Sequence, residues 1–239
     1  MTFWHSLLNF VLPPRCFLCD KVLDDAYGLC NECFSEMNLI KKPLCYECGQ
    51  PLETVLAPHH QLLCGHCLKP HRKIFRMSRS ACAYDEFSKK LILDFKFYDK
   101  TDLASFLAKM MFVAGQDIFD AGVDIILPVP LHLTRLIERK YNQSALLAVE
   151  LGKLAGICVD TQTLTKIRKT KQQVDCSGEE RLKNLRGAFA LKDDEKLKGK
   201  RLLLIDDVLT TGSTMKECAA VLKKAHPKSI DILTVARVL

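Results

Sequence analysis

The sequence predicts an α/β protein whose larger part is a doubly wound parallel sheet, preceded by a small cysteine-rich module. Four C-x-x-C pairs lie close together in the first third of the chain, and strand-like and helix-like apolar patterns alternate from about residue 76. Alternating strands and helices form parallel sheets that helices cover on both faces, so the second part predicts that architecture. We therefore expect two domains, residues 1–75 and 76–239.

Charge is distributed unevenly between these two parts. Residues 1–75 hold 7 basic and 7 acidic side chains, whereas residues 76–239 hold 28 and 21, so the whole surplus of +7 lies in the second part. Such an excess favours phosphorylated or polyanionic partners. No apolar run approaches the roughly 20 residues of a membrane-spanning helix, which argues against membrane insertion.

The first 12 residues are apolar and aromatic, but they lack a preceding basic region and a small-residue cleavage site. We interpret them as a packing or docking helix rather than a secretory signal, and expect a cytoplasmic protein.

Eight of the 12 cysteines form the four C-x-x-C pairs. A C-x-x-C turn directs two thiolates at one centre, and two turns complete a tetrahedral zinc site, so four turns provide ligands for two zinc ions. A disulfide-stapled module would require an export signal, and a thioredoxin-like redox site would have a single C-x-x-C on a helix after a strand. Structural zinc is therefore the preferred interpretation, with these ligands: Cys16, Cys19, Cys30, Cys33, Cys45, Cys48, Cys64 and Cys67.

How these pairs combine is left open by the sequence. Combining the first pair with the second and the third with the fourth closes short loops, but a crossed arrangement remains an alternative. Gly49 and Gly65 directly follow ligand cysteines and suit tight turns around a metal. Nearby histidines could replace a thiolate, although eight cysteines suffice: His59, His60, His66 and His71. The remaining cysteines are scattered and are expected to be buried or idle thiols: Cys82, Cys158, Cys176 and Cys218.

The second part predicts nine elements in alternation. Apolar runs and period-two patterns predict strands at 79–84, 124–129, 163–167, 201–205 and 229–238. Helical apolar spacing predicts helices at 87–97, 103–119, 133–155 and 214–225. Because ligands of doubly wound sheets bind beyond the carboxyl ends of the strands, residues that follow these strands are the candidates for a site.

The most informative segment is 202–214, which follows the strand beginning at residue 201. Two adjacent carboxylates, Asp206 and Asp207, precede a short loop with one glycine and a helix. The loop and the helix N-terminus would bind a phosphate through backbone N–H groups, with hydroxyl donors from Thr210, Thr211, Ser213 and Thr214. The carboxylates can accept hydrogen bonds from the vicinal hydroxyls of a ribose. An acidic strand end followed by a helix cap is the structural alternative, but the complete pattern favours a sugar-phosphate site.

This segment resembles the phosphoribosyl-pyrophosphate signature of type I phosphoribosyltransferases. Residues 128–132, Pro-Val-Pro-Leu-His, resemble the pyrophosphate loop of the ComF (ComFC/GntX) family of competence-associated proteins, and 139–143, Arg-Lys-Tyr-Asn-Gln, resemble its R-G-F-N-Q motif. A third stretch matches T-x-x-Q…S-x-x-E-R-x-x-N-x-x-G-A-F, with cysteine at position 176 where leucine is usual, at these residues: Thr170, Gln173, Ser177, Glu180, Arg181, Asn184, Gly187, Ala188 and Phe189. The family's N-terminal double zinc ribbon corresponds to residues 16–67.

The resemblance implies a role for each part of the site. Asp206 and Asp207 would hold the ribose, and the 5′-phosphate would bind to Val208, Leu209, Thr210, Thr211, Gly212, Ser213 and Thr214. Mg²⁺ would accompany the phosphoribosyl pyrophosphate, and its pyrophosphate would lie against Pro130, Leu131 and His132, with Arg139 as the nearest family-motif cation. Arg135 and Lys140 are further basic groups near that loop.

Residues 166–186 contain seven basic side chains: Lys166, Arg168, Lys169, Lys171, Arg181, Lys183 and Arg186. In type I enzymes a mobile flap stands at about this point, and a solvated loop and a nucleic-acid contact are the other interpretations.

Two function hypotheses follow. In the first, which the family resemblance implies, the protein binds phosphoribosyl pyrophosphate and single-stranded DNA and supports DNA uptake beside a ComFA-type helicase. In the second, it is an active phosphoribosyltransferase that acts on an unidentified acceptor and releases pyrophosphate. A fold of this kind does not by itself decide between binding and catalysis.

Overall fold

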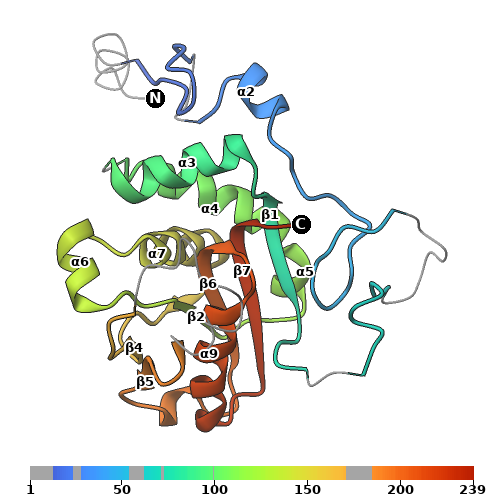
Figure 1. The fold of residues 1–239 in the computed structure, drawn as a ribbon, viewed down its shortest axis with the longest axis vertical. Coiled ribbons are helices and arrows are strands. Elements are labelled where there is room, and N and C mark those ends of the chain that lie inside the picture. The colour runs from blue at the N-terminus through green and yellow to red at the C-terminus, as the bar shows by residue number, and fades with distance from the viewer. Residues whose placement is uncertain (1–12, 24–27, 54–61, 71–72, 99, 171–184) are drawn as a thin grey trace.

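The computed structural model describes the chain except for residues 1–12, 24–27, 54–61, 71–72, 99 and 171–184. Predictions for the first helix, for three of the histidines, for Cys176 and for much of the basic segment 166–186 therefore lie outside the described residues. The centre of the fold is a five-stranded parallel sheet in the order β1-β7-β6-β2-β3 (Figure 1). Its strands are β1 (Ser78–Ala83), β2 (Ile125–Pro128), β3 (Cys158–Val159), β6 (Arg201–Leu209) and β7 (Ser229–Arg237).

Helices cover both faces of this sheet, which confirms the predicted doubly wound α/β class. The helices that the structure describes in the main domain are α3 (Glu86–Phe97), α4 (Leu103–Ala114), α5 (Gln116–Asp120), α6 (Leu133–Arg139), α7 (Gln143–Ala155) and α9 (Ser213–Leu222). Alternate side chains of β6 enter two separate cores. Leu203 and Ile205 pack in the core with buried residues of α3, α4 and α7, whereas Leu202 and Leu204 pack in the core with those of α9.

The predicted helix over 133–155 is wrong in one respect, because the chain forms two helices there. Helix α6 ends at Arg139, and the next residue, Lys140, has a left-handed backbone (φ 66°). Helix α7 begins after Asn142, whose side chain accepts a hydrogen bond from the N–H of Ser144. A helix-favouring apolar pattern runs through both segments, so periodicity alone did not reveal the break. The break occurs within the 139–143 motif.

The predicted helix over 103–119 is also divided, at Gly115, between α4 and α5. A Cβ atom at this position would lie 2.9 Å from Cδ2 of Leu233, so a larger residue here would require the leucine side chain to shift.

The strand predicted over 163–167 forms outside the main sheet. β4 (Leu164–Lys166) pairs antiparallel with β5 (Phe189–Leu191), which was not predicted, and the two make a separate hairpin. The short edge strand β3 was not predicted either. β6 is longer than expected, since it continues through Asp206 and Asp207 to Leu209. Two short 3₁₀ segments, Glu195–Leu197 and Lys223–Ala225 (η2), flank β6 and α9.

The cysteine-rich part lies along the β1 side of the sheet (Figure 1). Among its described residues, 31–35 form a short helix, α2 (Asn31–Ser35). Residues 38–40 pair with the outer edge of β1, since Leu39 forms an antiparallel bridge with Cys82 and the N–H of Ile40 donates to the carbonyl of Ala81. The first cysteine-rich loop contacts α3 and α4, where Lys90 Nζ donates to the carbonyl of Leu18 (2.7 Å) and Phe17 packs on Phe106.

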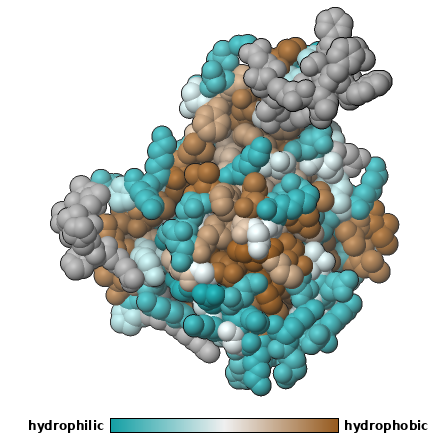
Figure 2. Space-filling model, turned by 180° about the vertical axis from the view of Figure 1, so that it is seen from behind, coloured by the Kyte–Doolittle hydropathy of each residue, from teal (hydrophilic) through white to brown (hydrophobic). Residues whose placement is uncertain are grey.

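Seen from behind relative to Figure 1, the molecule exposes hydrophobic side chains across its middle, above a hydrophilic lower edge (Figure 2). Phe34 and Val113 are exposed and border a hollow of about 520 Å³ between α2 and α4. Within the described ranges, none of the helices combines the length and the apolar character needed to cross a lipid bilayer.

Candidate functional site

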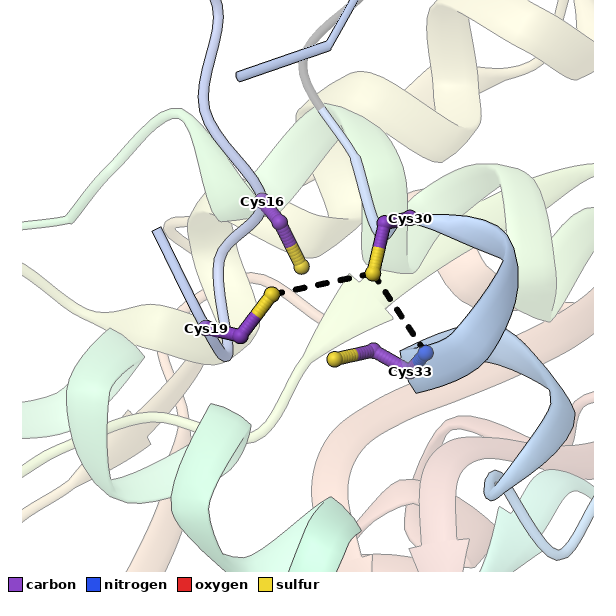
Figure 3. Close-up of side chains that lie close together, drawn as sticks. All are labelled: Cys16, Cys19, Cys30 and Cys33. Carbon is purple, nitrogen blue, oxygen red and sulfur yellow. Dashed lines mark hydrogen bonds between the residues drawn. The ribbon is translucent and has the colours of Figure 1, made fainter. Parts of the chain in front are cut away.

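The eight paired cysteines gather into two groups of four, in chain order. Cys16, Cys19, Cys30 and Cys33 form one group and Cys45, Cys48, Cys64 and Cys67 the other, and within each group all sulfur atoms lie within 4.8 Å of one another. Figure 3 shows the four sulfur atoms of the first group directed toward a common centre. The structure thus adopts the sequential combination of pairs, and His66, the candidate histidine that the structure describes, belongs to neither group.

The geometry of both groups fits a zinc ion. Tetrahedral ligands at a Zn–S distance of about 2.3 Å lie about 3.8 Å apart. The measured sulfur–sulfur distances of Cys19 to Cys30 and Cys48 to Cys64 are both 3.6 Å. Burial opposes ionisation of Cys16, but hydrogen bonds from backbone N–H groups, led by that of Cys30, outweigh it and lower the pKa of this thiol to about 6. Zinc binds the thiolate form, so the low pKa of Cys16 favours metal binding, whereas burial raises the pKa of Cys33 and of Cys67 in the absence of a metal ion.

The second cysteine group is held against the sheet by the buried side chain of Arg79. Its Nη1 donates to the carbonyls of Cys45 (3.4 Å) and Tyr46 (3.1 Å), and its Nε donates to Oδ2 of Asp117 (2.8 Å). Gly49 has φ +68°, and a Cβ atom there would lie 2.3 Å from the carbonyl oxygen of Ser78. Only glycine therefore allows the turn around this metal site to contact β1 so closely.

The two carboxylates predicted to hold a ribose lie at the carboxyl end of β6. Oδ1 of Asp206 accepts hydrogen bonds from the hydroxyl of Ser144 (2.8 Å) and from the backbone N–H of Asp207 (3.0 Å). Burial and the neighbouring charge of Asp207 raise the pKa of Asp206 to about 7. Near neutral pH this carboxyl group therefore changes its charge easily, and a bound cation would favour the ionised form.

Asp207 is buried and forms an ion pair with Lys96, whose Nζ lies 2.7 Å from Oδ2. Lys96 belongs to the last turn of α3, the helix that follows β1. Parallel strands end at one edge of the sheet, so the helix after β1 and the carboxylates of β6 reach the same site.

The loop after the carboxylates has the shape expected of an anion site. Gly212 has φ 70° and forms the N-cap of α9, while the hydroxyls of Thr211 and Ser213 lie 2.8 Å apart. A small hollow of about 20 Å³ is lined by Asp206 and residues 208–215. A phosphate here would meet backbone N–H groups, hydroxyl groups and the positive end of a ten-residue helix.

Residues 130–132 leave the sheet beside this loop, because Pro128 of β2 is paired with Ile205 of β6. Nδ1 of His132 accepts from the N–H of Thr134 (3.3 Å) and so caps α6. This arrangement brings the segment proposed for the pyrophosphate next to the carboxylates.

The 139–143 motif fixes the neighbouring backbone. Asn142 Nδ2 donates to the carbonyl of Val129 (3.1 Å), Tyr141 donates to that of Phe95 (2.7 Å), and Gln143 Nε2 donates to that of Lys96 (3.3 Å). The guanidinium of Arg139 lies over the ring of Phe97 at 4.9 Å and donates to Oε1 of Gln143. The motif thus joins the end of α3 to the loop after β2, which positions Lys96.

Sequence reasoning missed two residues of this site, Lys96 and Ser144. Lys96 looks like an ordinary charge on an amphipathic helix, and Ser144 looks like a residue within a longer helix. The available signal was topological, since both elements follow strands whose carboxyl ends meet at the site.

Comparisons with known proteins agree with both parts of the fold. The family model described as a double zinc ribbon domain matches residues 7–69, and the model described as a phosphoribosyl transferase domain matches residues 141–239. The DNA utilization protein YhgH of Salmonella typhimurium is 31% identical, covering 95% of this chain and 99% of that protein. YhgH of Escherichia coli K12 has the same identity and coverage.

Competence protein F of Haemophilus influenzae is also 31% identical, over 93% of this chain and 96% of that protein. This level of identity extends over nearly the whole of each chain. The protein therefore belongs to the ComF family, together with competence protein F and YhgH, and consists of a double zinc ribbon followed by a phosphoribosyltransferase-type α/β sheet.

Proposed function

We propose that the protein binds phosphoribosyl pyrophosphate with Mg²⁺ at the carboxyl edge of its sheet, binds single-stranded DNA, and supports DNA uptake in natural transformation. The observation that carries the sugar-phosphate part is the position of Asp206 and Asp207 directly before the anion loop 208–214. The DNA part is supported by the relatives, a DNA utilization protein and a competence protein, and by the surplus of +7 within residues 76–239. Action in the cytoplasm beside a ComFA-type helicase belongs to the same proposal.

The ligand would be held from three directions. Asp206 and Asp207 accept hydrogen bonds from the ribose hydroxyls, and the N–H and hydroxyl groups of 208–214 bind the 5′-phosphate. Residues 130–132 and Arg139 face the pyrophosphate. When bound, Mg²⁺ neutralises phosphate charge, and an ionised Asp206 beside Asp207 gives the site the oxygen donors that this metal prefers.

Thermal unfolding tests this site directly. Phosphoribosyl pyrophosphate with Mg²⁺ is expected to raise the melting temperature, since a ligand of the folded state stabilises it by mass action. The double variant Asp206→Asn, Asp207→Asn should lose this shift and keep its zinc. The matched control is Asp193→Asn with Asp194→Asn, two exposed carboxylates outside the site. An undiminished shift in the first variant would overturn the assignment of the carboxylates.

The biological part of the proposal has its own test. Deletion of the gene is expected to reduce transformation by external DNA at a step after the strand has entered the cell. Normal transformation frequency in a clean deletion would contradict the uptake role and leave the sugar-phosphate site standing.

Catalysis is the second candidate, favoured because the segment that we assign to pyrophosphate adjoins the carboxylates that we assign to the ribose. Residues 130–132 follow β2, whose pairing with β6 brings them near the carboxylates, and the charge of Arg139 interacts with that of Asp207. In that reaction an acceptor nitrogen forms a bond to the anomeric carbon, the bond from that carbon to pyrophosphate breaks, and the acceptor's proton leaves to solvent. The protein would act mainly by positioning and charge stabilisation. Pyrophosphate release measured with a panel of bases and amines separates this candidate from binding alone.

The division into residues 1–75 and 76–239 also remains part of the proposal. It is supported by the position of both cysteine groups before residue 68 and by the start of the sheet at Ser78.

A further inference from the structure

Two adjacent hollows lie beside the second cysteine group and the sheet. One hollow, of about 390 Å³, lies between this group and the start of α9, and a second, of about 270 Å³, lies between residues 73–76 and the start of β7. Lys73, Ile74 and Phe75 line both hollows, so the two adjoin at these residues. We call the two hollows together the basic groove, and their polar and aromatic lining includes Lys73, Phe75, Lys216, Lys223, Lys228 and Arg237.

Cations occur along the whole length of this groove. Lys216 lines the first hollow and Lys228 the second; both are exposed, and neither forms an ion pair within the described ranges. Arg237 donates to the carbonyl of Cys48, and Lys73 pairs with Glu47, so these two also fix the wall of the groove. Because Lys216 and Lys228 line different hollows, they are better placed to contact successive phosphates of one strand than a single phosphate.

The floor of the groove is apolar. Ile74 and Phe75 are half-buried, and Ile230 and Ile232 of β7 are buried. The hydroxyl of Ser78 lines the first hollow, is buried, and has no hydrogen-bond partner among the described residues. An aromatic ring, aliphatic side chains and an unsatisfied hydroxyl are suited to bases, which combine flat apolar faces with polar edges.

We propose that the basic groove is the path of a single-stranded nucleic acid, with phosphates on Lys216 and Lys228 and a base against Phe75. This proposal rests on the single-strand binding of the proposed function and names its contact surface. One wall of the groove is formed by Leu209, Thr210, Thr211 and Gly212. The same residues line the hollow assigned to the 5′-phosphate. Strand binding and sugar-phosphate binding therefore meet at one loop, and each changes the affinity for the other.

The electrostatic part is tested by fluorescence anisotropy with a labelled oligothymidylate over a range of salt concentrations. Lys216→Ala with Lys228→Ala is expected to reduce the slope of log affinity against log salt by roughly 1.4, about 0.7 for each lost phosphate contact on a single strand. The matched control is Lys41→Ala with Lys109→Ala, two exposed lysines beside the hollow between α2 and α4. This control removes the same charge and should leave the slope unchanged.

The aromatic part is tested at position 75. Phe75→Leu keeps an apolar side chain and is expected to weaken binding by about fivefold or more through the loss of stacking, whereas Phe75→Tyr should retain the affinity. Equal affinities for the two variants would mean that Phe75 only packs against the core, which would overturn its role as a stacking platform.

Further outcomes separate this proposal from the one on which it rests. If the unaltered protein fails to bind the oligonucleotide, the groove and the single-strand binding of the proposed function both fail, and the sugar-phosphate site is unaffected. If it binds, but the Lys216 and Lys228 variant behaves like the control while Lys169→Glu abolishes binding, only the groove is wrong. Equal affinity for a duplex, or displacement of the strand by thymidine monophosphate at a similar concentration of nucleotide, would also overturn the groove as a single-strand path.

Discussion

Lys96 Nζ lies 2.7 Å from Oδ2 of Asp207 and joins the end of α3 to the end of β6. Asp206 precedes Asp207, and the positive charge of Lys96 lowers the pKa of Asp206 against the larger, raising effect of burial. The ion pair thus controls how easily two adjacent carboxylates can both be ionised, which is the state that a sugar and a cation would require.

Replacing Lys96 therefore changes the titration of a different residue. Lys96→Met is expected to raise the pKa of Asp206 above its value of about 7, because the attraction of the Lys96 charge is removed while the repulsion from Asp207 remains. Carboxyl carbon NMR across the pH range measures this directly. Lys89→Met, an exposed change on the same helix, should leave the titration where it is, and Lys96→Arg should restore it.

Asp206 also predicts how stability depends on pH. Its folded pKa of about 7 lies above the value of about 3.9 expected in the unfolded chain, so the folded state holds the extra proton between these pH values. Stability contributed by this group is therefore present below about pH 4 and is lost as the pH rises toward 7.

Asp206→Asn cannot ionise, so the variant avoids the loss of folding stability as the pH rises. Its amide oxygen can still accept the hydrogen bond from the hydroxyl of Ser144. The variant should melt at a higher temperature than the unaltered protein at pH 8 and at nearly the same temperature at pH 4. Each 1 kcal/mol corresponds to roughly 2–4 °C for a chain of this size. A gain of equal size at both pH values would show that relief of ionisation is not the cause.

The zinc sites predict a stepwise loss of metal. Elemental analysis should find two zinc ions per chain, and Cys45→Ser should reduce the content to one and unfold the second ribbon, because metal binding and folding are coupled in such modules. Cys158→Ser removes an exposed cysteine outside both groups and serves as the control. Purified, chelator-free protein without zinc would contradict the assignment.

The contact between the second ribbon and β1 depends on a glycine. Gly49→Ala forces a side chain into a left-handed backbone, which costs about 1–2 kcal/mol, and brings its Cβ to 2.3 Å from the carbonyl of Ser78. We expect a melting temperature lower by several degrees with both zinc ions retained. Gly65→Ala is the matched control, since no atom lies within 4 Å of the added Cβ and its backbone is not left-handed. Equal effects would mean that the ribbon does not depend on this close approach.

The sequence was sufficient to predict the parts of this fold that local patterns encode. The run from residue 201 to Ile205 is apolar after its first side chain, and the acidic and hydroxyl residues that follow lie where a strand ends and a helix begins. The four C-x-x-C pairs likewise predict metal-binding turns, because each turn is a local feature.

Long-range geometry accounts for what was missed. The break between α6 and α7 depends on bonds from Tyr141 and Asn142 to backbone carbonyls of Phe95 and Val129, and no periodicity within 133–155 contains that information. The ion pair of Lys96 with Asp207 joins residues that are distant in the chain. The hairpin of β4 and β5 was missed because its strands are only three residues long and pair outside the main sheet.

Residues 38–40 occupy the outer edge of β1 by pairing with Ala81, Cys82 and Ala83. A strand edge with unpaired N–H and carbonyl groups is a template for the addition of another strand. Without residues 38–40, the edge of β1 would present such a template. The cysteine-rich part therefore also protects the sheet from self-association. A truncated chain that begins at residue 76 is expected to form oligomers or aggregates, however well its own helices and strands are made.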